Sequence, residues 1–320
     1  MLAILEANRG RYVNGQYIAD KLSITRSAVW KHIKQLRTEG YLIDSSPNKG
    51  YRLSAENDIL TEQSILPYLE GAAKNCRIEA RKSLPSTNTE LKKLAACGEP
   101  EGKVLIANEQ TAGRGRMGRS FYSPADSGIY MSVLLRPQLS AEKSVLLTTL
   151  AAVSAAKAIE QVCAVPVGIK WVNDLYCNDK KIAGILTEGG INLENGLLEY
   201  AVVGIGVNVS TADFPEEIKN TAGSVSAGGK QVSRPYLAAQ ILNRLFADLP
   251  KLESKAFLHE YKARSVVLGR EIFVIKNGMQ IPAVAEDIDE NAALLVRYAD
   301  GRTEKLSSYD ISIRHIGQKG

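Results

Sequence analysis

The residues best suited to chemistry lie in one short stretch, residues 113–119 (GRGRMGR), where arginines alternate with glycines. Arginine carries a planar, permanently charged guanidinium that matches phosphate or carboxylate oxygens, and glycine lets the backbone approach a ligand closely. This arginine loop is predicted to be mobile and to close over an anion; a solvated basic turn is the alternative. The spacing also fits a dinucleotide fingerprint, but that motif must open a helix, and aromatic residues and Pro124 follow instead.

Polar residues also mark the ends of expected strands and helices. Ser86, Thr87 and Asn88 precede a helix, where capping is the simplest role and holding a polar ligand head is the functional one. Gln110 stands just before the arginine loop and has either no role or a ligand-binding one.

Three further segments carry similar alternatives. Residues 170–175 (KWVNDL) place a lysine, Asn173 and Asp174 at a strand end, which is either a polar turn or part of a site. Residues 180–186 (KKIAGIL) begin a strand with two lysines, of which one is either a charged edge gatekeeper or functional. Residues 203–209 (VGIGVNV) put two glycines in a strand, most simply where another group approaches the backbone.

A central segment of mixed α/β pattern must position these residues. A polar linker is expected over residues 54–60, and Thr61 is expected to cap a short helix. Apolar patterning predicts helices over residues 88–97, 142–162 and 235–252. It predicts strands over residues 78–83, 104–109, 129–135, 167–171, 182–188 and 198–209.

The N-terminal segment carries the positive charge of the chain. Residues 1–54 hold nine Lys and Arg against four Asp and Glu, so they account for the whole formal net charge of +5. Helices are expected near residues 2–7, 16–22 and 26–39, followed by a hairpin with a basic tip. This order predicts a winged helix-turn-helix for DNA, with a small helical protein-docking domain as the alternative. The residues expected to face DNA are Arg26, Ser27, Trp30, Lys31, Lys34 and Lys49.

The C-terminal segment is predicted to form a separate β domain. Short alternating strands are expected over residues 271–275, 280–288, 293–298 and 303–306, joined by tight turns, which suggests a small SH3-like barrel. The expected domains are residues 1–58, 61–266 and 267–320.

Composition argues against several other classes of protein. No apolar run approaches the roughly 20 residues of a membrane helix. The apolar stretch at the N-terminus is interrupted by Glu6, which makes it too short for a signal peptide. The four cysteines show no C-x-x-C spacing, so a reducing cytoplasm and no structural metal site are expected.

In this order and at these intervals, the segments resemble the bifunctional biotin–protein ligases that also serve as biotin operon repressors. The resemblance covers essentially the whole chain, and its most specific parts are the arginine loop and residues 170–175 and 181–186. Met117, Phe121 and Val172 depart from residues common in that family, without removing a charged group. The implied fold class is α+β, with a winged helix-turn-helix, a central mixed α/β ligase domain and an SH3-like barrel.

The resemblance also implies roles for the residues above. The substrates and cofactors would be biotin, ATP and Mg²⁺, with Lys181, Arg116, Arg114 and Asp174 carrying the chemistry. Biotin would be bound by Ser86, Thr87, Asn88 and Gln110. The adenylate and nucleotide would be covered or lined by Arg114, Gly115, Arg116, Phe121, Asn173, Lys181, Gly184 and Gly206.

The implied partners are a biotin carboxyl-carrier protein, operator DNA and a second copy of the chain in a ligand-promoted homodimer. A carboxylate attacking a triphosphate brings anion to anion, so cationic neutralisation is the main requirement. Two alternatives remain: a lipoate or octanoyl ligase of related fold, and an effector-sensing repressor without ligase activity.

Overall fold

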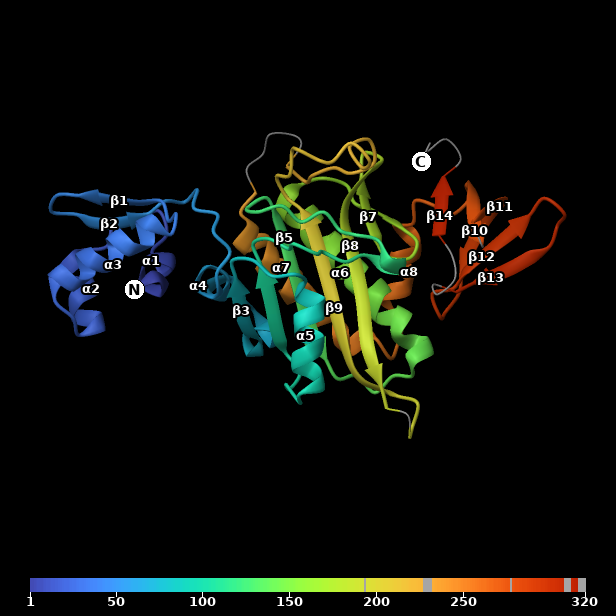
Figure 1. Cartoon of the computed structure of the whole chain (residues 1–320), viewed down its shortest axis with the longest axis horizontal. Coiled ribbons are helices and arrows are strands. Elements are labelled where there is room, and N and C mark those ends of the chain that lie inside the picture. The colour runs from blue at the N-terminus through green and yellow to red at the C-terminus, as the bar shows by residue number, and fades with distance from the viewer. Residues whose placement is uncertain (193, 227–231, 277, 308–311, 316–320) are drawn as a thin grey trace.

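The computed structural model describes the 320-residue chain except residues 193, 227–231, 277, 308–311 and 316–320. An N-terminal part, a large central part and a C-terminal β part follow one another along the long axis (Figure 1). This arrangement confirms the α+β fold class expected from the sequence.

The N-terminal part is the expected winged helix-turn-helix. Helices α1 (Leu2–Ala7), α2 (Gly15–Leu22) and α3 (Arg26–Thr38) precede a hairpin of β1 (Ile43–Ser46) and β2 (Gly50–Leu53). As predicted, α3 begins at a cap, because Thr25 Oγ1 accepts the Ala28 N–H at 3.2 Å. The apolar side of α3 is packed inward, with Val29 and Ile33 each 1% exposed. Arg26, Lys31 and Lys34, on its other sides, are exposed.

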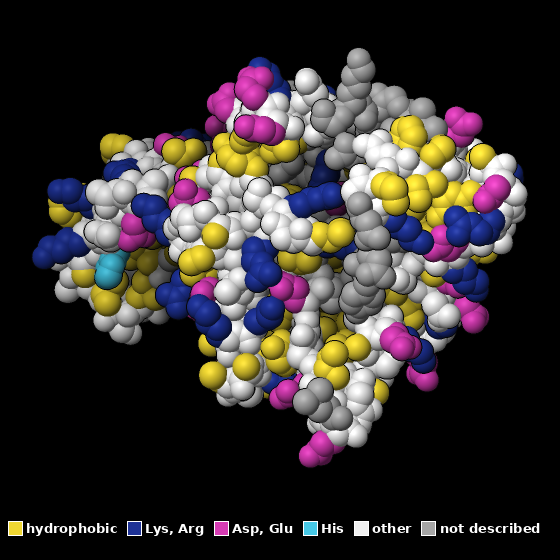
Figure 2. Space-filling model, turned by 45° about the vertical axis from the view of Figure 1, so that its right-hand side comes forward, with side chains coloured by type: hydrophobic (Ala, Val, Ile, Leu, Met, Phe, Trp, Pro, Cys, Tyr) yellow, Lys and Arg dark blue, Asp and Glu magenta, His cyan; other side chains and the backbone are white. Residues whose placement is uncertain are grey.

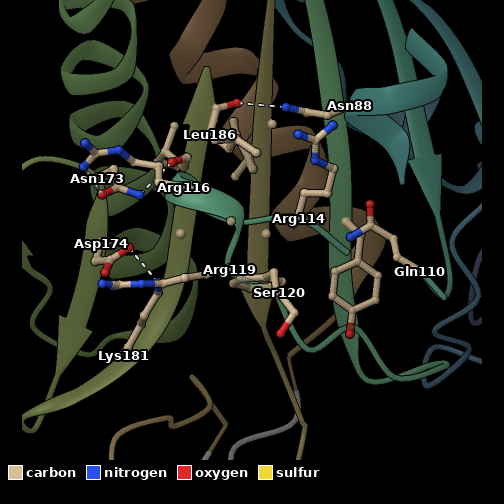
Figure 3. Close-up of a pocket in the computed structure, with 18 of the residues that line it drawn as sticks. Asn88, Gln110, Arg114, Arg116, Arg119, Ser120, Asn173, Asp174, Lys181 and Leu186 are labelled. Carbon is tan, nitrogen blue, oxygen red and sulfur yellow. Dashed lines mark hydrogen bonds and ion pairs between the residues drawn. The ribbon is translucent and has the colours of Figure 1, made fainter. Parts of the chain in front are cut away.

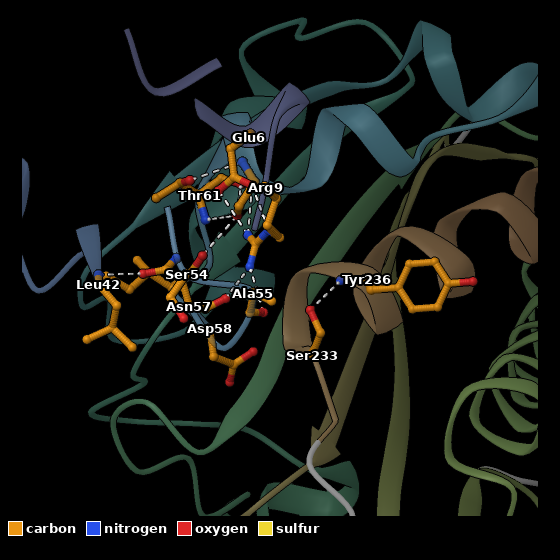
Figure 4. Close-up of polar contacts among 12 residues, drawn as sticks. Glu6, Arg9, Leu42, Ser54, Ala55, Asn57, Asp58, Thr61, Ser233 and Tyr236 are labelled. Atoms are coloured by element: carbon orange, nitrogen blue, oxygen red, sulfur yellow. Dashed lines mark hydrogen bonds and ion pairs between the residues drawn. The ribbon is translucent and has the colours of Figure 1, made fainter. Parts of the chain in front are cut away.

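The segment after the hairpin is packed against both of its neighbours. Asn57 and Leu60 are buried, and the Arg9 guanidinium donates to the Asn57 carbonyl oxygen and pairs with the buried carboxylate of Glu6 (Figure 4). Thr61 caps α4 (Glu62–Ile65), as predicted. The expected polar linker is therefore correct in position, but it is fixed in place.

Asp58 attaches this segment to the central part. Its carboxylate accepts from Arg234 Nε (2.6 Å) and from the Arg234 backbone N–H (2.6 Å), and its carbonyl oxygen accepts from Arg234 Nη2 (2.7 Å). Arg234 opens helix α7 and is only 3% exposed. The sequence contained no signal for this contact, because the two residues are far apart in the chain.

The central part is built on a sheet with strand order β3-β4-β5-β9-β8-β7-β6. All neighbouring pairs are antiparallel except β3 and β4. The short strand β7 was not expected from the sequence. The bounds are β3 (Arg77–Arg81), β4 (Lys103–Ala107), β5 (Gly128–Leu135), β6 (Gly168–Lys170), β7 (Asp174–Cys177), β8 (Lys180–Ile191) and β9 (Leu198–Asn208).

Helices cover the two faces of this sheet unequally (Figure 1). Helices α6 (Ser144–Cys163) and α7 (Arg234–Asp248) pack on one face, together with α8 (Phe257–Ala263), which was not expected. Helix α5 (Thr87–Ala96) packs on the opposite face, over β4, β5 and β9. Helix α5 also reaches β8 through Asn88 and Lys92, and the part of that face toward β7 extends beyond it.

Helix α6 is long and apolar on average. The stretch Ala141–Cys163 has the length and mean hydropathy (1.4) of a membrane span, although Glu142, Lys143, Lys157 and Glu160 interrupt it, so it is not a continuous apolar run. Its residues are nevertheless mostly buried against the sheet and α7, which makes it a core helix.

The C-terminal part is an antiparallel sheet of order β13-β12-β11-β10-β14, consistent with an SH3-like unit. The indole N–H of Trp171 in the central part donates to the Ala292 carbonyl oxygen at 2.8 Å, which joins the two parts. The bounds are β10 (Glu271–Lys276), β11 (Met279–Ile288), β12 (Leu294–Tyr298), β13 (Thr303–Leu306) and β14 (Ser312–His315), of which β14 was not expected.

Candidate functional site

A cavity of about 440 Å³ lies on the face of the sheet that α5 leaves open. Its walls come from α5, the arginine loop, and strands β5, β7, β8 and β9 (Figure 3). Its size is in the range of sites for small ligands. It brings together all the residues singled out for the ligand and the chemistry: Ser86, Thr87, Asn88, Gln110, Arg114, Gly115, Arg116, Phe121, Asn173, Asp174, Lys181, Gly184 and Gly206.

Two glycines of β9 make room for this cavity. Residues 202, 204 and 206 share one face, since side chains alternate along a strand. A Cβ at Gly204 would lie 2.2 Å from Asn88 Oδ1, and one at Gly206 would lie 2.6 Å from the Phe121 ring. The prediction that another group approaches the backbone here is confirmed.

One end of the cavity, the amide end, is a buried and neutral hydrogen-bond network of Thr87, Asn88, Gln110 and Ser132. Gln110 Oε1 accepts from the Thr87 backbone N–H (2.9 Å) and hydroxyl (3.1 Å). Ser132 Oγ lies 2.7 Å from Thr87 Oγ1 and 2.6 Å from Asn88 Oδ1. These polar groups are already oriented before a ligand arrives.

Ser86, in the same segment, has a different role. Its Oγ accepts the Thr89 N–H at 3.4 Å and caps α5. The capping alternative therefore holds for Ser86, whereas Thr87 and Asn88 turn into the network. Ser86 is buried at the cavity wall, so capping does not exclude contact with a ligand.

Glu188 on β8 closes the amide end. Its carboxylate accepts from Asn88 Nδ2 (3.0 Å) and Lys92 Nζ (2.9 Å), and Arg114 Nη2 lies 3.5 Å away. Burial raises the pKa of Glu188, but the bonds from Lys92 and Asn88 and the charges of Lys92 and Arg114 outweigh burial and lower it. Glu188 is thus held as a carboxylate.

The other end, the cationic end, holds Arg116, Asn173, Asp174 and Lys181 (Figure 3). Lys181 Nζ lies 2.6 Å from Asp174 Oδ1, which has no other partner among the described residues. Arg116 Nη1 donates to Asn173 Oδ1 at 3.2 Å. Strand β8 lies between β9 and β7, so Lys181 is not an edge gatekeeper.

Arg116 is held in a partly dry position. Burial lowers the pKa of its guanidinium, against the opposing effects of Asp174 and Tyr261. Tyr261 is buried behind this end and donates to the Val172 carbonyl oxygen at 3.0 Å. A guanidinium with few surrounding waters interacts more strongly with an anion.

The arginine loop forms a closed hairpin over the cavity. The Gly115 N–H donates to the Arg119 carbonyl oxygen (2.7 Å), and the Phe121 N–H donates to that of Gly113 (2.9 Å). The chain then runs to β5 without the helix that a dinucleotide motif needs. The mobility expected for this loop stays a prediction.

The surface expected to contact DNA is exposed. Arg26, Ser27, Lys31 and Lys34 project from α3, and Trp30 is 54% exposed with Lys34 Nζ 5.6 Å from its ring centre. Lys and Arg side chains project from this part of the molecule at the left of Figure 2. Lys49, at the exposed hairpin tip, lies 5.9 Å from the ring of Tyr12.

Four residues near these surfaces were not singled out from the sequence. Ser132 lies in an apolar run that is typical of a buried strand, and Glu188 lies at the end of a predicted strand. Tyr261 belongs to a helix that was not expected, and Tyr12 stands in a turn. The signal that could have found Ser132 is its parity: it shares the sheet face of Gly204, its partner across β5 and β9.

Comparisons with known proteins agree with this geometry. Residues 80–208 match the Biotin/lipoate A/B protein ligase family, and residues 1–52 match an HTH domain. The chain is 39% identical to Bifunctional ligase/repressor BirA of Bacillus subtilis, over 72% of this chain and 71% of the relative. It is 30% identical to BirA of Escherichia coli, over 98% and 96%.

A solved structure has the same fold over much of the chain. It is the biotin protein ligase of Aquifex aeolicus in complex with biotin and ATP, with a TM-score of 0.65 and 28% identity. The similarity covers 75% of this chain and 99% of that one.

Proposed function

Because the chain belongs to the family of bifunctional ligase/repressor proteins, we propose that it is an ATP-dependent, AMP-forming biotin–protein ligase that also represses transcription. It activates biotin as biotinyl-5'-AMP and transfers the biotinyl group to a lysine of a biotin carboxyl-carrier protein. The observation that carries this proposal is the cavity itself, which places a neutral amide network and a cluster of cations at its opposite ends.

The residues at the cationic end suit the first step. A carboxylate oxygen of biotin attacks the α-phosphorus of ATP, and pyrophosphate leaves. Lys181 and Arg116 offset the charge that gathers on the reacting oxygens, which is the main barrier between two anions. The expected part of Arg114 in the chemistry stays a prediction, since its Nη2 lies 3.5 Å from Glu188 at the amide end. No side chain of the protein is needed as a nucleophile.

The second step uses the acyl-adenylate, a mixed anhydride, as an activated acyl donor. The Nζ of the carrier lysine attacks the acyl carbon, an amide bond forms, and AMP leaves with the bonding electrons of the acyl–oxygen bond. Asp174 can orient the incoming amine or take its proton. Before this attack the arginine loop keeps water away from a mixed anhydride that hydrolyses readily.

The residues present also fit Mg²⁺. Asp174 supplies a buried carboxylate oxygen that pairs with the Lys181 ammonium at 2.6 Å, and Asn173 supplies an amide oxygen that accepts from Arg116. Mg²⁺ is usually bound by one or two carboxylates together with substrate phosphates, so a full set of protein ligands is not required. When bound, the ion would neutralise phosphate charge next to Lys181.

Pyrophosphate release tests the ligase proposal. The purified chain is supplied with ATP and either biotin, lipoate, octanoate or no acid. We expect release with biotin and little with the other acids. Release with lipoate or octanoate but not with biotin would favour the alternative ligase, and release with none would favour a repressor without ligase activity.

For repression, we propose that the exposed basic side of α3 enters the major groove and that Lys49 of the hairpin contacts the backbone. One such surface gives weak, non-specific binding at physiological salt, so a ligand-promoted homodimer on a palindromic operator is the functional form. Ordering the arginine loop on the adenylate lowers the cost of association. We place the protein in the cytoplasm, with domains 1–58, 61–266 and 267–320.

Sedimentation and gel shifts, run with and without biotin plus ATP, test this second activity. Both self-association and operator affinity should rise with biotin plus ATP, and ATP alone should raise neither. Equal values in all conditions would leave the chain as a ligase whose DNA binding is not controlled by its product.

A further inference from the structure

The hydroxyl of Ser132 has two acceptors within reach but only one proton. Asn88 Oδ1 lies 2.6 Å from its Oγ and Thr87 Oγ1 lies 2.7 Å away, and all three groups are buried. A hydroxyl donates one proton and accepts through two lone pairs, so Ser132 serves one neighbour at a time. The neighbour that accepts the Ser132 proton determines which lone pairs at the amide end remain available to a ligand.

Glu188 helps to determine which neighbour receives the Ser132 proton, because it orients the side-chain amide of Asn88. The Asn88 Nδ2 donates both to Glu188 Oε2 (3.0 Å) and to the Leu186 carbonyl oxygen (3.1 Å). Neither a carboxylate nor a carbonyl can donate, so both require the amide nitrogen on their side. The amide oxygen of Asn88 then faces Ser132, and because it has no proton of its own, the Ser132 proton goes to Asn88.

The rest of the network follows from this assignment. The Thr87 hydroxyl donates to Gln110 Oε1 at 3.1 Å, and Gln110 Oε1 also accepts the Thr87 backbone N–H. Gln110 is held in its orientation, since its Nε2 donates to Ser123 Oγ at 2.9 Å and Ser123 in turn donates to the Phe121 carbonyl oxygen. Because the Ser132 proton goes to Asn88, it does not occupy a lone pair of Thr87 Oγ1, which stays an acceptor for a ligand.

We propose that Glu188 is a specificity-determining positioning residue that makes the amide end an acceptor surface for a ligand head with N–H donors, such as a cyclic urea. This inference rests on the proposed function, because biotin carries a head of this kind. A fatty-acid chain has no N–H group and leaves these buried acceptors unpaired, which disfavours it by about tenfold or more.

The variant E188Q is expected to change the direction of the hydrogen bonds that begin at residue 188. Lys92 Nζ and Arg114 Nη2 both contact Oε1 of Glu188, so these cations keep the new amide oxygen and the new NH2 group faces Asn88. The Asn88 amide is then held in its original orientation by the Leu186 carbonyl alone, so the turned-over form, in which Asn88 donates to Ser132 and Ser132 donates to Thr87, becomes more populated. In that form Thr87 Oγ1 accepts from Ser132, and a single lone pair stays open for two ligand N–H groups.

The double variant E188Q/S132A makes the test specific. Without the Ser132 hydroxyl no proton is forced onto Thr87, so Thr87 keeps both lone pairs whichever way Asn88 faces. We expect E188Q to weaken biotin binding about tenfold, S132A to weaken it less, and the double variant to bind about as well as S132A alone. Two sites that merely stabilised the fold would instead show additive losses.

The matched control is T187V. Thr187 precedes Glu188 on β8 but faces α6, where its Oγ1 accepts from Thr148 Oγ1 at 2.8 Å. This variant also loses a hydrogen bond on the same strand, outside the cavity. Thermal melting of all four variants shows that each one is folded.

The measurements are calorimetric titration with biotin in the absence of ATP, the KM for ATP, and the inhibition constant of octanoate against biotin. Octanoate has a carboxylate but no N–H group, so E188Q should change its inhibition constant and the KM for ATP by less than about twofold. Equal changes for biotin and octanoate, or no recovery in the double variant, would overturn the inference. If the wild-type chain binds biotin without releasing pyrophosphate, the proposed ligase function fails while the titrations still decide the role of Glu188; absence of biotin binding overturns both.

Discussion

The two ends of the cavity are prepared in opposite ways. At the amide end, buried neutral groups are bonded to one another and keep their orientation. At the cationic end, charged groups are partly exposed and are paired with acceptors of the protein, as in the Lys181–Asp174 ion pair. The first end can recognise a ligand without rearrangement, whereas the second must exchange its partners when an anion enters.

Under the proposed function, this difference would separate recognition of the acid from the chemical steps. Fixed dipoles lose little entropy when a ligand binds, which suits the end that selects the acid. Paired cations avoid an uncompensated charge in a partly dry site and become available to phosphate oxygens only when the substrates arrive. Substitutions at the two ends should therefore affect different kinetic steps.

The largest effect is expected at the cationic end, from K181M. Methionine keeps most of the aliphatic stem and deletes the charge, so the rate of adenylate formation should fall by roughly 2–4 kcal/mol in activation free energy. Biotin binding in calorimetry should be nearly unchanged, because the amide end is intact. Near-normal pyrophosphate release by this folded variant would remove Lys181 from the chemistry.

R116G should have the next largest effect. It removes a charged donor, worth roughly 1.5–3 kcal/mol, and adds backbone freedom to the arginine loop. The adenylate should form more slowly and escape faster, so that bystander lysines are acylated. Filter retention of labelled adenylate measures its residence time, and an unchanged residence time would contradict a clamping role.

At the amide end, G204A should weaken biotin binding. The new Cβ would lie 2.2 Å from Asn88 Oδ1, so Asn88 must move and the network must distort, at a cost of about 1–3 kcal/mol. Titration with biotin shows the loss, while the KM for ATP should change little. A parallel loss in both would mean that the two ends are not independent.

The smallest expected effect is a pH dependence of stability. Because the pKa of Glu188 is lowered in the folded protein, its carboxylate stabilises the fold above the ordinary carboxyl pKa near 4.3. That contribution is lost as pH falls through the folded pKa. The free energy of unfolding of the wild-type chain should exceed that of E188Q by about 1 kcal/mol at neutral pH.

Denaturant unfolding at several pH values measures this difference. It should shrink at acidic pH, where Glu188 is protonated beside Lys92 and Arg114. A difference that stays constant down to strongly acidic pH would show that the charge of Glu188 does not matter to the fold.

The sequence predicted well the features that are local. The cap at Thr25, the long core helix and most strands follow from residue type and period, which neighbouring residues determine. The residues grouped as a candidate site also proved to line one cavity. The sequence did not predict features that depend on contacts between distant segments.

Ser132 and Glu188 show why. Each lies in a strand whose pattern is explained by packing alone, and only the register across β5, β9 and β8 places them beside α5. Strand β7 and helix α8 were missed because they are short, with bounds set by their neighbours in space. Asp58 was read as part of a polar linker, since its partner Arg234 opens a distant helix.

The attachment of Asp58 to Arg234 has a consequence for the distance between helix α3 and the central sheet. The bonds of Asp58 to Arg234 restrain the segment that joins α3 to the central part. If the protein acts as the proposed twofold dimer, we expect them to restrict the distance between its two α3 helices. The number of base pairs between the two halves of the operator would then depend on this ion pair, in which Arg234 is buried and Asp58 is partly exposed, as well as on α3.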